Sequence, residues 1–284
     1  MPGQLFIVAT PIGNLEDTTQ RALRVLREVD LIACEDTRHT QKLLNHFAIP
    51  TKAISYHEHN ERARAEEICG SLESGKNVAL VSDAGTPLIS DPGFRIVQAA
   101  IDRGISVVPI PGASALVTAL SASGLATDRF LFEGFLPPRS NARRQRLAEL
   151  SAIHATLVFY EAPHRIAATL KDALDVLGNR AGVVARELTK LHEEFARGTL
   201  AELEERFSSQ DTARGEIVLL ISGQPAEATN GVATPVERLG ERINELERDG
   251  VDSKDALKQA ARELGIKRAE AYRLIVNQKN RRNK

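Results

Sequence analysis

The chain has 284 residues, of which 42% are hydrophobic and 26% charged, and its formal net charge is −1 at pH 7. This composition is typical of a globular protein, and the length corresponds to roughly two domains. A net charge near zero excludes nucleic-acid binding through overall positive charge, so any such surface must be concentrated in one region. No apolar run approaches the roughly 20 residues that span a bilayer, and no basic segment precedes the first apolar run. Together with two isolated cysteines, Cys34 and Cys69, this predicts a cytoplasmic protein.

Short apolar runs alternate with helix-like segments through the first part of the chain. Strands are predicted at residues 5–9, 31–34, 52–55, 78–81 and 105–108. Helical spacing is found at residues 18–28, 43–47, 63–72 and 94–101. Strands that alternate with helices predict an α/β domain with a parallel sheet, whose strands end at a common edge.

The most informative stretch, residues 82–93, reads Ser-Asp-Ala-Gly-Thr-Pro-Leu-Ile-Ser-Asp-Pro-Gly and follows the buried strand at 78–81. It contains far more turn and polar residues than a simple turn needs. Open α/β sheets bind ligands at the carboxyl ends of their strands, so the stretch is a candidate ligand loop. The alternative is a long turn whose aspartates cap its own backbone.

Three further loops are predicted at the same edge. Residues 10–15 form a turn after the first strand, and residues 35–40 combine acid, hydroxyl, base and imidazole groups after the second. The second loop could equally cap the helix that follows it. Residues 111–115 open a helix with small residues, which leaves free amide donors for a carboxylate or phosphate.

In the remainder of the chain, the sequence indicates a second α/β domain followed by a tail. A linker of small and polar residues at 121–128 divides domain 1–122 from domain 123–223. Residues 224–234 form a second linker before a basic, helix-turn-helix-like tail at 235–284. The tail is either an RNA-binding module or a packing appendage. An arginine run near the start of the second domain is either a solvated face or a phosphate-binding surface; it comprises Arg139, Arg143, Arg144 and Arg146.

Six segments together resemble the tetrapyrrole methylase superfamily of S-adenosylmethionine-dependent methyltransferases. They are residues 9–15, 34–38, 82–93, 111–114, 160–165 and 186–190. The resemblance covers residues 4–222 and departs from the family at two places. Ala9 and Pro11 stand in a loop that is usually glycine-rich, and Thr86 stands where the family usually has aspartate.

The resemblance implies two α/β domains with S-adenosylmethionine in the cleft between them, and a homodimer. Within the family it implies transfer of a methyl group to the ribose 2′-hydroxyl of a cytidine in small-subunit (16S) ribosomal RNA, free or assembled. The cofactor contacts that it implies are Pro11, Gly13, Asp83, Gly85, Thr86, Pro87, Ile89, Ser90, Ser114, Ala115, Phe135 and Tyr160. The RNA contacts expected from basic residues are Arg38, Arg139, Arg143, Arg144, Arg165, Lys267, Arg268 and Arg273.

A ribose hydroxyl becomes a good nucleophile when a nearby base removes its proton. Four charged side chains at or just past predicted strand ends are candidates, namely Asp36, Glu161, Glu187 and Lys190. No metal-ligand spacing is evident, so we expect cofactor binding without a metal. Two other functions stay open: a small-molecule methyltransferase of the tetrapyrrole type, and a non-catalytic RNA-binding assembly protein.

Overall fold

The first half of the chain forms a five-stranded sheet of order β3-β2-β4-β1-β5, and every neighbouring pair is parallel. This confirms the predicted α/β class. Its strands are β1 (Gln4–Val8), β2 (Leu31–Cys34), β3 (Ala53–Ser55), β4 (Val78–Val81) and β5 (Ser106–Ile110). Pro109 lies in β5, which is an edge strand and therefore tolerates a residue that cannot donate a ladder hydrogen bond.

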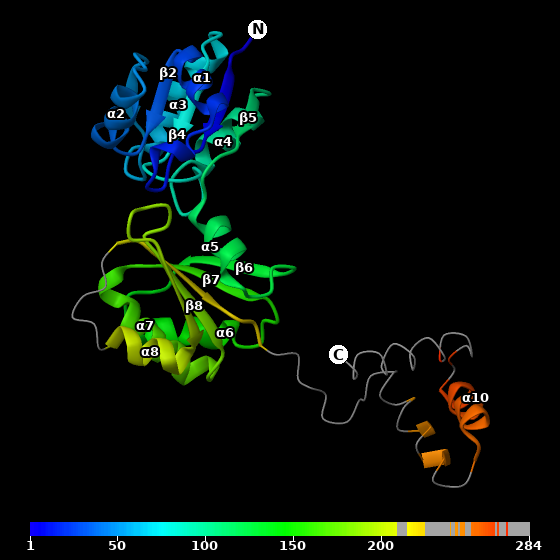
Figure 1. Ribbon diagram of the computed structural model, residues 1–284. Coiled ribbons are helices and arrows are strands. Elements are labelled where there is room, and N and C mark those ends of the chain that lie inside the picture. Colours follow the sequence, from blue (N-terminus) through cyan, green and yellow to red (C-terminus); the bar gives the residue numbers. More distant parts are fainter. Residues whose placement is uncertain are drawn as a thin grey trace. The chain divides into compact units, whose positions relative to one another are not determined.

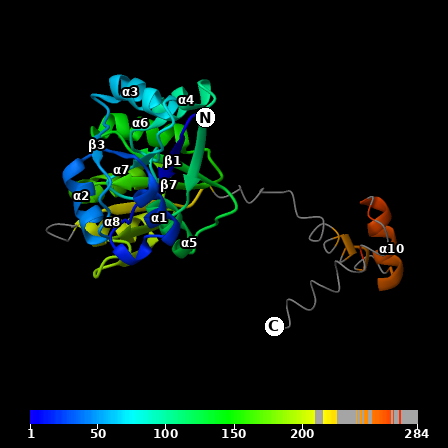
Figure 2. The same cartoon turned by 90° about the horizontal axis from the view of Figure 1, so that it is seen from above.

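Helices cover both faces of this sheet, because alternate residues of each strand point to opposite sides. The helices are α1 (Gln20–Glu28), α2 (Thr37–His46), α3 (Glu61–Glu73) and α4 (Phe94–Asp102), with a short 3-10 helix, η1 (Leu15–Asp17), before α1. Ala79 and Val81 pack with α1 and α2, whereas Leu80 packs with α3 and α4. In the view from above, α3 and α4 lie together on one side of the sheet (Figure 2).

The second half forms a mixed sheet of order β6-β7-β10-β8-β9. Its strands are β6 (Phe130–Phe135), β7 (Thr156–Glu161), β8 (Ala181–Arg186), β9 (Glu194–Thr199) and β10 (Ile217–Ile221). Only β6 and β7 pair in parallel, and the other neighbours are antiparallel. The strand β9 was not predicted from the sequence, and its residues include the charged Glu194 and Arg197.

The second sheet also has helices on both faces. These are α5 (Ala115–Ser123), α6 (Ser140–Leu150), α7 (Ile166–Leu177) and α8 (Leu200–Ser208), with a 3-10 helix, η2 (Pro163–Arg165), before α7. Figure 1 shows α5 on one side of this sheet and α7 and α8 on the other. Because α5 continues to Ser123, the predicted linker at 121–128 begins inside a helix rather than after it.

The structure describes residues 1–208, 215–224, 239, 242–243, 245–247, 251–264, 266 and 271. The chain divides into two units, 1–224 and 225–284. The second unit includes α10 (Ser253–Glu263) and a small core of its own, formed by residues such as Leu239, Leu246 and Ala260. Among the helices described, none is long and apolar enough to cross a membrane.

One predicted RNA contact is instead part of the interior. The side chain of Arg143 is 4% exposed, and its Nη2 lies 2.6 Å from Oδ2 of Asp172, which is 8% exposed. Ser140 Oγ donates to the same carboxylate at 3.0 Å. This ion pair joins α6 to α7, so Arg143 cannot face RNA, and we correct that prediction.

Because Arg143 and Asp172 form a buried ion pair, we expect Arg143→Met to lower the free energy of unfolding strongly. The variant leaves the Asp172 carboxylate buried without its main cation, which typically costs about 3–5 kcal/mol. Arg139→Met is the matched control, because Arg139 is exposed and should change the free energy of unfolding by less than about 0.5 kcal/mol. Urea unfolding of both variants measures the difference, and equal midpoints would contradict a structural role for the pair.

Candidate functional site

The loop at residues 82–93 leaves β4 at the carboxyl edge of the first sheet and is fixed by backbone hydrogen bonds. Thr10 N donates to Gly85 O at 2.9 Å, and Gly85 N donates to Thr10 O at 3.1 Å. Thr86 Oγ1 donates to Ala113 O at 3.2 Å. The loop that follows β4 is thereby tied to the loops that follow β1 and β5.

The same loop contains several residues with positive φ. They are Gly85 at 81°, Leu88 at 73°, Ser90 at 64° and Gly93 at 144°. Leu88 and Ser90 carry side chains that disfavour this conformation, so the surrounding structure must hold them there. Such strain is typical of ligand loops and argues against a simple turn.

A cavity of about 290 Å³, which we call the central pocket, lies beside this loop. Loops of the first half and strands of the second line it, including Ile12 and Ser114 from the first half and Tyr160 and Val218 from the second. Eight of the sequence-predicted cofactor residues line the central pocket: Gly85, Thr86, Ile89, Ser90, Ser114, Ala115, Phe135 and Tyr160. The structure therefore brings together residues from four separate segments of the sequence.

One wall of the central pocket is aromatic because of a β-bulge. The register of β6 against β7 shifts between Phe132 and Gly134, so Phe132 pairs with Val158 and Phe135 pairs with Tyr160. Without the extra residue, two side chains three positions apart would point to opposite faces. With it, both rings lie against Tyr160, with centroid distances of 4.9 and 5.7 Å. Such a wall suits a flat heterocycle.

The central pocket also offers donors for an anion. Ser114 is the N-cap of α5, and its side chain makes no capping hydrogen bond. The first amides of a helix have no intrahelical partner and attract carboxylate or phosphate groups. Aromatic side chains and the N-terminus of a helix in one cavity fit a ligand that carries both a heterocycle and an acid.

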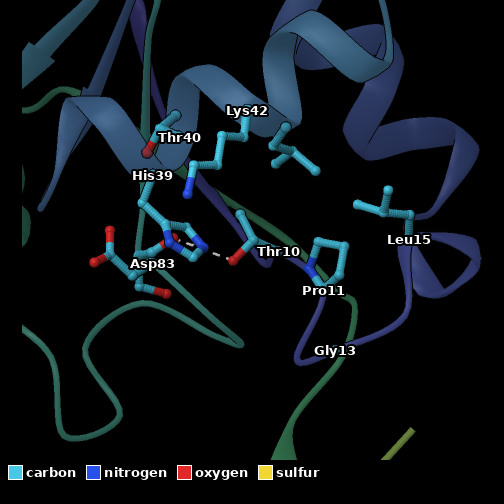
Figure 3. Close-up of a pocket in the computed structure, with 10 residues that line it drawn as sticks. Thr10, Pro11, Gly13, Leu15, His39, Thr40, Lys42 and Asp83 are labelled. Carbon is cyan, nitrogen blue, oxygen red and sulfur yellow. Dashed lines mark hydrogen bonds between the residues drawn. The ribbon is translucent and has the colours of Figure 1, made fainter. Parts of the chain in front are cut away.

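Three predicted cofactor residues, Pro11, Gly13 and Asp83, line a separate cavity of about 280 Å³, which we call the polar hollow. Figure 3 shows His39 and Lys42 of α2 and Asp83 around this hollow, with the hydrogen bond from Thr10 Oγ1 to Ser82 O beside them. Pro87 lines neither cavity.

Two of the four predicted bases are poorly suited to take a proton. Asp36 caps α2 by accepting from Arg38 N at 2.8 Å, and the hydrogen bonds from Arg38 lower the pKa of its carboxyl to about 2. Glu161 lines the central pocket, but its oxygens accept from Thr169 Oγ1 at 2.6 Å and from Ala162 N at 2.7 Å. A carboxylate of low pKa or with occupied oxygens is a weak acceptor.

The other two candidates, Glu187 and Lys190, pair with each other. Lys190 Nζ lies 2.9 Å from Glu187 Oε1 and 3.3 Å from Glu216 Oε2. The hydrogen bond from Lys190 lowers the pKa of Glu187. Burial acts to lower the pKa of Lys190, but the hydrogen bond to Glu187 and the charge of Glu216 outweigh it and raise that pKa. Both groups therefore stay charged at neutral pH.

The sequence did not single out Asp91 as a site residue, although it belongs to the quoted loop. Asp91 lines the central pocket. Burial, and then the charge of Glu35, raise the pKa of Asp91 to about 6. Its burial results from the folded loop, so the residue type alone carried no signal for it. Among the residues that the structure describes, no group of three or more His, Cys, Asp or Glu could hold a metal ion.

The predicted RNA contacts are dispersed. The Arg38 side chain is 89% exposed and pairs with Asp36, and Arg144 pairs with Asp175 at 2.7 Å. Arg165 is mostly buried, and its Nη2 donates to Leu136 O at 2.8 Å. Its guanidinium therefore holds the backbone at the end of β6 and is mostly shielded from solvent. The remaining tail contacts, Lys267, Arg268 and Arg273, lie outside the described residues.

Comparison with known proteins identifies the family. Residues 4–204 match the model for tetrapyrrole (corrin/porphyrin) methylases. The chain is similar to proteins named ribosomal RNA small subunit methyltransferase I. The identity is 50% to that of Halalkalibacterium halodurans (96% of this chain and 94% of that protein) and 46% to that of Escherichia coli O157:H7 (97% and 96%).

Solved structures share the fold at low identity. Uroporphyrin-III C-methyltransferase from Thermus thermophilus, complexed with S-adenyl homocysteine, aligns with a TM-score of 0.54 and 19% identity, over 77% of this chain and 97% of that one. Cobalt precorrin-4 methyltransferase aligns with a TM-score of 0.58 and 15% identity, over 77% and 94% of the two chains. At such identities the likeness concerns the fold alone.

The central pocket predicts that Gly85→Val weakens cofactor binding. Gly85 has a φ of 81°, and an added Cβ would lie 3.4 Å from Ile12 Cγ2. Strain on the order of 1–3 kcal/mol should displace the loop and lower the affinity for S-adenosylmethionine by roughly tenfold or more.

Gly104→Val is the matched control for this variant. Gly104 has a φ of 68° with no atom within 4 Å of an added Cβ, and it is not among the residues that line the central pocket. Both variants should lose stability, but only Gly85→Val should lose affinity in calorimetry. Equal affinities would mean that the loop does not form the binding surface.

Proposed function

Because the chain belongs to the tetrapyrrole (corrin/porphyrin) methylase family, we propose that it transfers a methyl group from S-adenosylmethionine to small-subunit ribosomal RNA. The acceptor is the ribose 2′-hydroxyl of a cytidine in 16S RNA. One observation carries the choice of substrate: relatives about half identical over 96% of the chain are named small-subunit ribosomal RNA methyltransferases. The family itself also contains methylases of small molecules.

The central pocket is the proposed cofactor site. Its helix N-terminus at Ser114 suits the carboxylate of the methionine part, and its aromatic wall at Phe135 and Tyr160 suits adenine. When bound, S-adenosylmethionine supplies an electrophilic methyl group on a sulfonium. The loop after β4 then has to position the acceptor in line with that methyl group, and such positioning can supply much of the catalysis.

The polar hollow is a proposed contact for the RNA backbone. Lys42 and His39 both line it, and cationic side chains near a site attract phosphates. The exposed Arg38, on the same helix, adds a third basic group. This places one source of positive charge on α2, apart from the basic tail.

Localisation and assembly complete the proposal. We expect a cytoplasmic homodimer, as the resemblance to the family implies. Cys34 and Cys69 are both free and buried, which supports a reducing compartment.

The proposed reaction predicts ribose methylation in a defined assay. The full chain should transfer label from S-adenosylmethionine to small subunits or to free 16S RNA, and nucleoside analysis should recover 2′-O-methylcytidine. A tetrapyrrole should receive no label under the same conditions. Label on the tetrapyrrole alone would favour a small-molecule methyltransferase, and cofactor binding without any transfer would favour an assembly protein.

We expect the tail to contribute to RNA binding but not to cofactor binding. A chain that ends at Gln224 keeps both sheets and their cores, so it should still bind S-adenosylmethionine. Residues 267–284 contain seven basic residues against one acid, so this chain should lose most of its RNA affinity.

Fewer phosphate contacts should also make the dependence of affinity on salt shallower. RNA binding by both chains at several salt concentrations measures this effect. Equal affinities and equal slopes would show that the tail only packs, and would leave α2 and Arg139 as the basic surface.

A further inference from the structure

Asp91 lies between the central pocket and a third cavity of about 580 Å³, which we call the outer hollow. The outer hollow is lined by Glu58, Glu61, Asp91, Pro92, Gly93, Phe94, Arg95 and Gln98. Asp91 is common to the linings of both cavities. A group at this position can contact a molecule in either cavity.

The backbone on both sides of Asp91 is held in unusual conformations. Ser90 has a φ of 64° and Gly93 a φ of 144°. An added Cβ on Gly93 would lie 2.9 Å from Leu80 Cδ2, so the chain passes directly over the core of the first sheet. This fixes where the Asp91 carboxylate can lie, and it explains a glycine at the N-cap of α4.

The charged neighbours of Asp91 are mostly acidic. Glu35 follows β2, Asp83 follows β4, and Tyr160 faces it from β7. Burial is the main cause that raises the pKa of Asp91 to about 6, Glu35 and Asp83 add to it, and the Ser82 hydroxyl opposes it. Asp91 is therefore ionised at neutral pH yet more basic than an ordinary carboxylate.

An exposed aromatic ring lies next to this carboxylate. Phe94 opens α4, is 69% exposed and lines the outer hollow. Single exposed rings are common, but one beside a partly buried carboxylate that lines the proposed cofactor pocket has a specific use, because nucleic-acid bases stack on aromatic side chains. Arg95 is held beside it by Glu61, with Nε 2.5 Å from Oε1.

We infer that the outer hollow is the subsite for the target nucleoside, with the base stacked on Phe94 and Asp91 as the group that accepts the proton of the 2′-hydroxyl. This inference rests on the proposed function. Glu58 in the same hollow is exposed and suits a cytosine amino group, which donates hydrogen bonds. The acidic lining favours the uncharged nucleoside over a phosphate, so the phosphates are held elsewhere.

The transfer step balances with these groups alone. The ribose oxygen forms a bond to the methyl carbon as the carbon–sulfur bond breaks, and the bonding pair stays on sulfur, which becomes a neutral thioether. The hydroxyl proton passes to the Asp91 carboxylate. The products are the 2′-O-methyl nucleoside, S-adenosylhomocysteine and a protonated Asp91, which then releases its proton to solvent.

The first test is Asp91→Asn in the full chain, with ribosomal RNA or subunits and S-adenosylmethionine. Turnover should fall by roughly a hundredfold or more, the usual contribution of a positioned base. Affinity for S-adenosylhomocysteine in calorimetry should stay within about twofold if, as we infer, the carboxylate serves the acceptor. The wild-type rate should rise with pH through about 6, because Asp91 must lose its proton to act, and the variant should lack this rise.

Asp102→Asn is the matched control, since Asp102 is an exposed carboxylate at the C-terminal end of α4, the helix that follows Asp91. Asp91→Asn should not lower the midpoint of urea unfolding, because it removes a charge that burial disfavours. Near-normal turnover in Asp91→Asn would overturn the inference, and so would a parallel loss of cofactor affinity. A wild-type chain that methylates no RNA would instead overturn the proposed function.

The second test is Phe94→Ala, with Ile101→Ala as its control. Ile101 is also an exposed apolar residue of α4, at 59%, but it does not line the outer hollow. Loss of a stacked base should raise the KM for RNA by about tenfold or more and leave cofactor affinity unchanged. Equal KM values for the two variants would overturn the stacking role.

Discussion

The central pocket depends on the pairing of two loops that leave neighbouring parallel strands. Because β1 and β4 are adjacent and parallel, the chain emerges from both at the same edge of the sheet. There Thr10 and Gly85 exchange two backbone hydrogen bonds as an isolated antiparallel bridge. The bridge holds the long loop against the first turn, and the strained residues Leu88 and Ser90 are sustained by that support. A looser loop would leave the pocket without a defined wall.

The same side-chain type has different properties at this edge because its partners differ. Asp36 accepts several hydrogen bonds from Arg38 and is a poor base. Glu161 is saturated by Thr169 and its neighbours. Asp91 is partly buried among other acidic groups and has a raised pKa. The carboxylates at this edge therefore differ in basicity because they differ in burial and in the hydrogen bonds that they accept, and not because of their residue type.

Much of the fold could be predicted from local patterns. The buried runs of the first sheet, their alternation with helices and the polar loops at their ends all follow from hydrophobic spacing, so the class and the ligand edge were evident. Contacts between distant segments were not. Arg143 looked like its exposed neighbour Arg139, and only its meeting with Asp172 of α7 makes it an interior residue. The strand β9 was obscured because charges at an edge strand resemble those of a loop. Asp91 was overlooked as a site residue because its burial depends on how the loop folds over Leu80.

The bulge in β6 shows how a family with one architecture can come to accept different ligands. Phe135 reaches the central pocket because a single extra residue shifts it onto the face that carries Phe132. A substitution at this position changes one side chain only. An insertion or deletion in the strand would exchange the set of side chains that point inward, while the backbone pairing beyond it stayed in place. Changes of length in this strand are thus a short evolutionary route to a new binding preference, and they would be missed when only amino-acid replacements are considered.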